Sequence, residues 1–184
     1  MGKTVLSLDL ATHLGWCVGD HETGKPLSGH HKLPVTGDDI GEFIDAYDRW
    51  LVPMLVTHQP AIVTFENPIV QGQGQTTLST TLKLVGLVVH TEFRCRRFTW
   101  KRDRPPINVA NVNVGTWKVS FCGSAKFSKK TKPYPPIVKC KELGFENVTN
   151  DNEADAIGLF AHTVGLMPGH GGMRFTTLGK MMAA

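Results

Sequence analysis

Long apolar runs are missing from this 184-residue sequence, although 41% of its residues are hydrophobic. Every apolar stretch is far shorter than the roughly 20 residues that a membrane-spanning helix needs, so we expect no membrane span. The four cysteines stand far apart without a CxxC pair or a zinc-site spacing, which favours reduced thiols in a cytoplasmic protein. The first ten residues, MGKTVLSLDL, carry an acid and no cleavage-like site, so we expect no signal peptide.

Acidic residues are nearly missing between Arg94 and Lys141, where 13 Lys or Arg residues accompany a single acid, Asp103. This basic segment carries a formal charge of +12, whereas the rest of the chain carries −8. Such a concentration of positive charge predicts a polyanionic partner, most often a nucleic acid. The alternative is a basic face that only keeps the protein soluble.

Periodicity predicts an α/β domain. Short, apolar, β-rich runs bounded by turn residues indicate strands, and these are residues 4–10, 15–20, 27–33, 61–67 and 105–113. Apolar residues spaced by three and four indicate helices, and these are residues 36–58, 76–93, 114–123, 134–145 and 150–166. Pro53 is expected to kink or interrupt the first helix.

This order of elements predicts a mixed central sheet flanked by helices. A three-stranded antiparallel meander comes first and parallel strands follow, because helices connect the later strands. We expect one domain over residues 1–168 and a loose tail over residues 169–184.

Acids stand at positions where α/β proteins build sites, the carboxyl ends of strands. Asp9 ends the first strand, Glu66 ends the fourth, and Asp155 lies in the last helix, with Asp151 one turn before it on the same face. Clustered carboxylates repel unless cations neutralise them, and hard oxygen ligands favour Mg²⁺ or Mn²⁺. Two such ions can activate water and stabilise the leaving oxygen of a phosphodiester. Each acid also has a structural alternative, as a helix cap or a salt-bridge partner.

Four motifs resemble the RuvC family in order and spacing: LSLDLATHLGW, VTFENP, WKVSFCGSAKFSKK and NDNEADAIGLFA. The resemblance covers residues 5–164 and implies an RNase H-like fold and a Holliday-junction resolving endonuclease. It also implies that Asp9, Glu66 and Asp155 are catalytic, metal-binding acids. The Asp-Leu-Ala-Thr form of the first motif resembles phage and prophage members rather than the commoner Asp-Pro-Gly form.

The fourth metal ligand departs from the family pattern. The family usually has Asp or His three residues before the last acid, where this chain has Asn152. We expect Asp151 to take its place as a catalytic and metal-binding residue, with Asn152 second because an amide oxygen is a weaker ligand. Glu153 is a third choice if the helix begins irregularly. The resemblance implies Mg²⁺ or Mn²⁺, with two ions per active site.

The resemblance also implies DNA contacts in two regions, the basic segment and the loop that follows Glu66. The candidate DNA-binding residues are Lys118, Lys126, Lys129, Lys130, Lys132, Gln71 and Gln73. Phosphate contacts from lysines supply affinity but little sequence recognition. The glutamine-containing loop has a plain flexible loop as its alternative, and Trp117 is expected to be a core anchor rather than a base-stacking platform.

We therefore predict a crossover junction endodeoxyribonuclease that acts as a homodimer on four-way DNA, leaving 5′-phosphate and 3′-hydroxyl ends. A two-fold symmetric junction suits two active sites. Leu82, Val85 and Val89 are the candidate dimer contact, and core packing is their alternative role. Two other functions stay open: a nuclease for structured RNA, resembling YqgF proteins, and a catalytically silent nucleic-acid-binding module. The expected location is the cytoplasm of a bacterial or phage-infected cell.

Overall fold

The computed structural model describes residues 3–21, 26–66, 77–98, 106–127 and 131–165. The strands are β1 (Thr4–Asp9), β2 (His13–Asp20), β3 (Leu27–Lys32), β4 (Ile62–Glu66) and β5 (Asn108–Val112). The helices are α1 (Ile40–His58), α2 (Leu78–Arg97), α3 (Val114–Cys122), α4 (Pro135–Glu142) and α5 (Asp151–Gly165).

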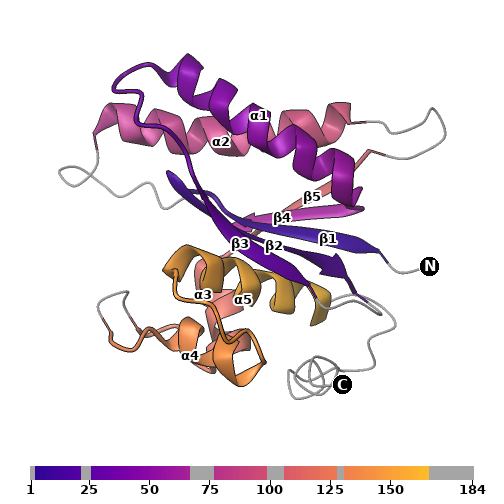
Figure 1. Ribbon diagram of the computed structural model, residues 1–184, viewed down its shortest axis with the longest axis vertical. Helices are drawn as coiled ribbons and strands as arrows, with labels where there is room; N and C mark the ends of the chain where they lie inside the picture. The colour runs from indigo at the N-terminus through magenta and orange to yellow at the C-terminus, as the bar shows by residue number, and fades with distance from the viewer. Residues whose placement is uncertain (1–2, 22–25, 67–76, 99–105, 128–130, 166–184) are drawn as a thin grey trace.

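The described strands form one five-stranded mixed sheet in the order β3-β2-β1-β4-β5. β1, β2 and β3 pair antiparallel as a meander, and β1, β4 and β5 pair in parallel. The parallel pairs arise because helices α1 and α2 each return the chain to the starting edge of the sheet (Figure 1). The predicted meander followed by parallel crossovers is therefore confirmed.

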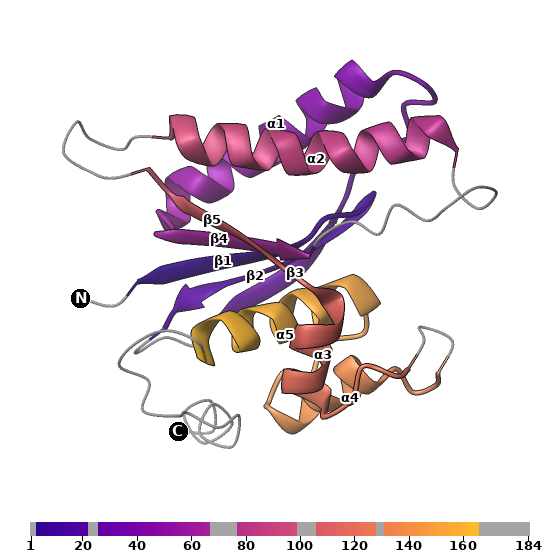
Figure 2. The same cartoon turned by 180° about the vertical axis from the view of Figure 1, so that it is seen from behind.

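Helices cover both faces of the sheet. Figures 1 and 2 show α1 and α2 on one face and α3, α4 and α5 on the other. Each face has its own apolar core: Leu8, Tyr47 and Phe65 belong to the core beneath α1 and α2, whereas Val5 and Trp117 belong to the core around α5. Alternate residues of β1 thus belong to different cores, because successive side chains of a strand point to opposite faces of the sheet.

The first helix differs from its predicted bounds in two ways. It begins at Ile40 rather than at residue 36, because the Asp39 carboxylate accepts a hydrogen bond from the Glu42 N–H over 2.8 Å and acts as the N-cap. It also continues through the exposed Pro53 to His58, so the expected interruption was wrong. The buried side chains on either side of Pro53 hold both halves of the helix against the core, and these are Leu51 and Leu55.

The second helix also differs from its predicted bounds, because it ends at Arg97 rather than at residue 93. Arg94 donates from Nε and Nη2 to the two carboxylate oxygens of Asp48 over 2.5 Å each, and Cys95 is fully buried. These contacts anchor an additional turn against α1.

The predicted apolar side of this helix faces outward. Leu82, Val85 and Val89 are 44%, 40% and 59% exposed, so core packing, their alternative role, is wrong. The buried positions of α2 are instead Lys83, Leu87, Thr91 and Cys95.

Within the described residues, no helix is both long and apolar enough to cross a membrane. The tail expected over residues 169–184 lies outside the described residues, so the division into domain and tail stays a prediction.

Candidate active site

Strand alternation directs Asp9 and Glu66 to the same face of the sheet. Leu8 and Phe65 pair in the parallel β1–β4 ladder and lie in the core beneath α1 and α2. The next residue of each strand points the opposite way, so the carboxylates of Asp9 and Glu66 face α5 at the carboxyl ends of adjacent strands. One carboxylate oxygen of Asp9, Oδ2, is buried.

Helix α5 brings Asp155 to this edge because Gly15 lets the helix approach closely. Gly15 pairs with Asp9 across β1 and β2. A Cβ atom at Gly15 would lie 1.8 Å from the carbonyl oxygen of Asn152, so only glycine leaves room for the first turn of α5. Asn150 caps this turn, since its Oδ1 accepts a hydrogen bond from the Asn152 N–H over 2.9 Å.

A buried tyrosine outside the recognised acid pattern holds Asp155. Tyr134 is 1% exposed and Asp155 is 3% exposed, and the tyrosine hydroxyl donates to Asp155 Oδ1 over 2.7 Å. Burial, then the charges of Asp155, Asp151 and Asp9, raise the pKa of Tyr134. The phenol therefore stays protonated, and three of the predicted acids act electrostatically on a single hydroxyl group.

Trp117 holds Glu66 in a similar way. The indole is fully buried against α5, where a Cβ atom at Gly158 would lie 2.6 Å from its ring. Its Nε1–H donates to Glu66 Oε2 over 3.0 Å. The expectation of a core anchor is confirmed, whereas its hydrogen bond to a predicted metal ligand had no signal in the sequence, because a tryptophan indicates burial and not its polar partner.

All three candidates for the fourth ligand lie in the first turn of α5. Asp151 is the first residue of the helix and its charge contributes to the raised pKa of Tyr134, which places it in the region of Asp155. Asn152 instead donates from Nδ2 to the carbonyl oxygen of His13 over 2.6 Å. The amide side chain thus joins α5 to the start of β2.

The third candidate, Glu153, contacts β3. Its Oε1 accepts a hydrogen bond from Ser28 Oγ over 2.8 Å, and its Oε2 lies 3.5 Å from His30 Nδ1. The hydrogen bond from Ser28 fastens the Glu153 side chain, and with it the first turn of α5, to the meander, which favours Asp151 over Glu153 as the fourth acid.

The donor chemistry of this edge suits a hard divalent cation, since the candidates offer carboxylate oxygens and one amide. The side chains do not form a finished metal site: among the described residues, no three Asp, Glu, His or Cys side chains are arranged to hold an ion. Tyr134 donates to one oxygen of Asp155 and Trp117 to one oxygen of Glu66. A carboxylate oxygen has more than one acceptor position, so such a hydrogen bond does not prevent it from ligating a cation. The residues therefore fit a cation chemically, and an ion would have to draw them together.

The basic segment, one stretch in the sequence, is divided between two places in the fold. Arg94, Arg96 and Arg97 end α2, at the opposite end of the sheet from Asp9 and Glu66 (Figure 2). The described candidate lysines follow the start of α3: Lys126 and Lys132 are exposed, and Lys118 is half-buried. The other four candidates lie outside the described residues: Lys129, Lys130, Gln71 and Gln73.

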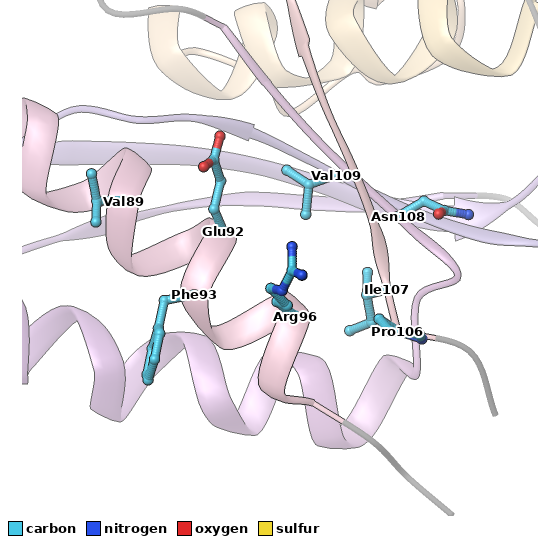
Figure 3. A pocket seen from close by; sticks show the side chains of 8 residues that line it. All are labelled: Val89, Glu92, Phe93, Arg96, Pro106, Ile107, Asn108 and Val109. Atoms are coloured by element: carbon cyan, nitrogen blue, oxygen red, sulfur yellow. The ribbon is translucent and has the colours of Figure 1, made fainter. Parts of the chain in front are cut away.

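A groove of about 760 Å³ lies apart from the acids, between the last turns of α2 and the start of β5. Figure 3 shows Glu92 and Arg96 reaching from α2 toward the β5 side of this groove, which is otherwise largely apolar. Its lining residues are Val89, Glu92, Phe93, Arg96, Pro106, Ile107, Asn108 and Val109. The predicted acids do not line it.

Comparisons with solved structures identify the fold. RuvC of Thermus thermophilus aligns with a TM-score of 0.60 and 16% identity, covering 88% of this chain and 94% of that chain. The same protein in complex with Holliday junction substrate aligns with a TM-score of 0.61 and 14% identity, covering 89% and 94%. The yeast mitochondrial Holliday junction resolvase Ydc2 aligns with a TM-score of 0.61 and 14% identity, covering 96% and 80%.

No protein-family profile matches the sequence, and no curated protein matches it. The structural comparisons nevertheless agree on one architecture. The chain has a RuvC-like fold, and the mixed sheet flanked by helices that the sequence predicts is confirmed.

Proposed function

We propose that this protein is a metal-dependent, structure-selective DNA endonuclease that resolves Holliday junctions by paired phosphodiester hydrolysis. The observation that carries the proposal is the arrangement of Asp9, Glu66 and Asp155, which come from two adjacent strand ends and the facing helix. The excess of basic residues elsewhere in the chain supports a nucleic-acid substrate. Assignment to the phage type of the family rests on the first motif alone and stays a prediction.

The proposed cofactor is Mg²⁺ or Mn²⁺, with two ions in each site. Asp9, Glu66, Asp151 and Asp155 would hold the ions through carboxylate oxygens, the ligands that these hard cations prefer. When bound, the ions supply an activated water and neutralise charge on the leaving oxygen.

The chain's own residues have separate tasks in this reaction. Tyr134 and Trp117 orient the carboxylates of Asp155 and Glu66 by hydrogen bonds. The exposed Lys126 and Lys132 offer ammonium groups to DNA phosphates. Hydrolysis then leaves 5′-phosphate and 3′-hydroxyl ends, and two copies of the site cut the two symmetry-related strands.

A labelled synthetic four-way junction, incubated with and without Mg²⁺, tests this function. We expect paired incisions in the presence of the metal and none in its absence. Linear duplex DNA and structured RNA are the controls: preferential cutting of RNA would favour an RNA nuclease, and binding without metal-dependent cutting would favour a silent binding module.

The proposed homodimer would form through the exposed apolar stripe of α2. This stripe consists of Leu78, Leu82, Val85, Val89 and Phe93, which are 40% to 75% exposed. A continuous apolar surface of this kind marks an interaction site more often than a solvent-facing one. The stripe continues into the groove of Figure 3, which Val89 and Phe93 help to line.

Changing Leu82 and Val89 to Glu is expected to convert the dimer to a monomer, because buried charges without partners would oppose association. Sedimentation analysis at several protein concentrations measures the change. Val56→Glu is the matched control, since Val56 is 47% exposed on α1 and lies outside the stripe. A double variant with the wild-type mass in solution would show that α2 is not the interface.

Changing Lys126, Lys129, Lys130 and Lys132 to Ala is expected to weaken junction binding and its dependence on salt. Each lost phosphate contact reduces the slope of log binding constant against log salt by about 0.9, so we expect a change of about two to four units. The loss should be similar for any DNA sequence. Arg49→Ala on α1 is the control, and an unchanged slope in the quadruple variant would place the DNA path elsewhere.

A further inference from the structure

The two hydrogen bonds that hold predicted metal ligands come from residues on either side of one loop. Trp117 lies on α3, which precedes the loop, and Tyr134 occupies the N-cap position of α4, which follows it. The tyrosine makes no side-chain capping bond to its own helix. Its hydroxyl instead donates to Asp155, as Trp117 Nε1 donates to Glu66. We name the described residues 124–127 and 131–133 the basic loop, since they include the exposed Lys126 and Lys132.

Aromatic and cationic side chains join the two ends of this loop. Lys118 Nζ lies 5.3 Å from the Trp117 ring and 5.4 Å from the centroid of the Phe127 ring. The Phe127 ring meets the Tyr134 ring edge-on, with centroids 5.9 Å apart and planes at 75°. We call these four residues the aromatic bridge. Contacts of both kinds are favourable at these distances.

The members of the aromatic bridge differ in what holds them. Trp117 and Tyr134 are almost fully buried, and the indole packs closely against Gly158 of α5. Phe127 is only half-buried and lies in the basic loop, directly after Lys126. The position of Phe127 therefore depends on the loop, whereas the rings at either end belong to the core.

Resting on the function proposed above, we propose that Tyr134 is a positioning residue for Asp155 and that Phe127 couples this positioning to the basic loop. Phosphates bound by Lys126 hold the loop, and the held Phe127 keeps the Tyr134 ring in the orientation in which its hydroxyl meets Asp155. DNA binding and metal binding then favour each other, and thermodynamic linkage makes that effect reciprocal. The measurable consequence is a metal affinity that depends on bound DNA.

The first test compares Tyr134→Phe with Tyr47→Phe. Tyr47 is also fully buried, and its hydroxyl makes a 2.7 Å hydrogen bond to Thr91 between α1 and α2, remote from the acids. Both changes remove one buried hydroxyl and should lower stability to a similar extent. Mn²⁺ binding to the free protein, followed by electron paramagnetic resonance, should weaken about tenfold in Tyr134→Phe only. Junction binding without metal should be unchanged in both.

The second test uses Phe127→Leu, which keeps the Tyr134 hydroxyl but removes the ring contact. The Mn²⁺ titration is repeated with a four-way junction whose linkages resist hydrolysis. In the wild type we expect the junction to tighten Mn²⁺ binding by at least about fivefold. In Phe127→Leu that gain should largely disappear, while Mn²⁺ binding to the free variant stays within about twofold of wild type.

Each outcome decides one claim. Equal Mn²⁺ affinities in Tyr134→Phe and Tyr47→Phe would overturn the positioning role, and an equal junction effect in wild type and Phe127→Leu would overturn the coupling. Either of these two results can be obtained with a protein that cuts junctions, and the proposed function then stands. If the wild-type protein binds Mn²⁺ but does not cut branched DNA, the proposed function is wrong. The comparison of Tyr134→Phe with Tyr47→Phe still decides whether Tyr134 positions Asp155. Absence of Mn²⁺ binding in the wild type would overturn both.

Discussion

Asp9→Asn is expected to abolish cleavage of a four-way junction, with a loss of at least about a thousandfold, while junction binding is preserved. A metal ion supplies several kcal/mol of transition-state stabilisation, and each 1.4 kcal/mol is worth about tenfold in rate. Asparagine keeps the shape of the side chain but removes the charge that offsets the cation. DNA binding should survive because it depends on lysines, and Asp9 lies on a strand apart from them.

Cleavage and gel-shift assays on the same protein preparation measure the two effects separately. Asp45→Asn is the control, because Asp45 is an exposed carboxylate on α1, on the other face of the sheet. Thermal unfolding of Asp9→Asn shows separately whether the variant is folded. Activity within a few-fold of wild type would remove Asp9 from the metal site.

Asp151→Ala is expected to reduce cleavage by about a hundredfold, more than Asn152→Ala does. A carboxylate offsets the charge of a cation and an amide does not. The surroundings of the two side chains favour the same order. The charge of Asp151 helps to raise the pKa of the Tyr134 hydroxyl that donates to Asp155, whereas the Asn152 side chain donates to the carbonyl oxygen of His13.

Asn152→Ala should act mainly through stability, because it removes the link between α5 and the start of β2. An intramolecular hydrogen bond contributes about 1 kcal/mol to stability, and urea unfolding measures the loss. Metal titrations of cleavage then separate the two variants: the metal requirement should rise in Asp151→Ala and stay close to wild type in Asn152→Ala. The reverse order would mean that the fourth ligand lies three residues before Asp155, as is usual in the family, and that Asn152 is that ligand.

Local signals in the sequence were enough to locate the strand acids. Asp9 and Glu66 each follow a short apolar run, and alternation along a strand decides which face they share once the two strands are paired. The mixed pairing of the strands followed in the same way, because short turns make antiparallel neighbours and intervening helices make parallel ones. The place of β4 beside β1 came only from the structure. Helix ends were less accurate, since the side chain of Asp39 and the tertiary contact of Arg94 set them.

Other features required the tertiary structure. The apolar repeat of α2 predicted a helix but not which side of it would be covered, because exposed and buried apolar stripes have the same period. The basic segment looked continuous, yet β5 runs between its two parts and leaves Arg96 and Lys126 at different ends of the fold.

The α/β class, the mixed pairing of the strands and the positions of Asp9 and Glu66 at strand ends could be predicted from the sequence, because each of these depends on residues near one another in the chain. The groups that donate hydrogen bonds to Glu66 and Asp155 follow instead from the packing of elements that are distant in the chain. Trp117 meets Glu66 across 51 residues, and Tyr134 meets Asp155 across 21. Aromatic residues signal burial at any such position, and their polar atoms acquire a partner only when separate elements pack together.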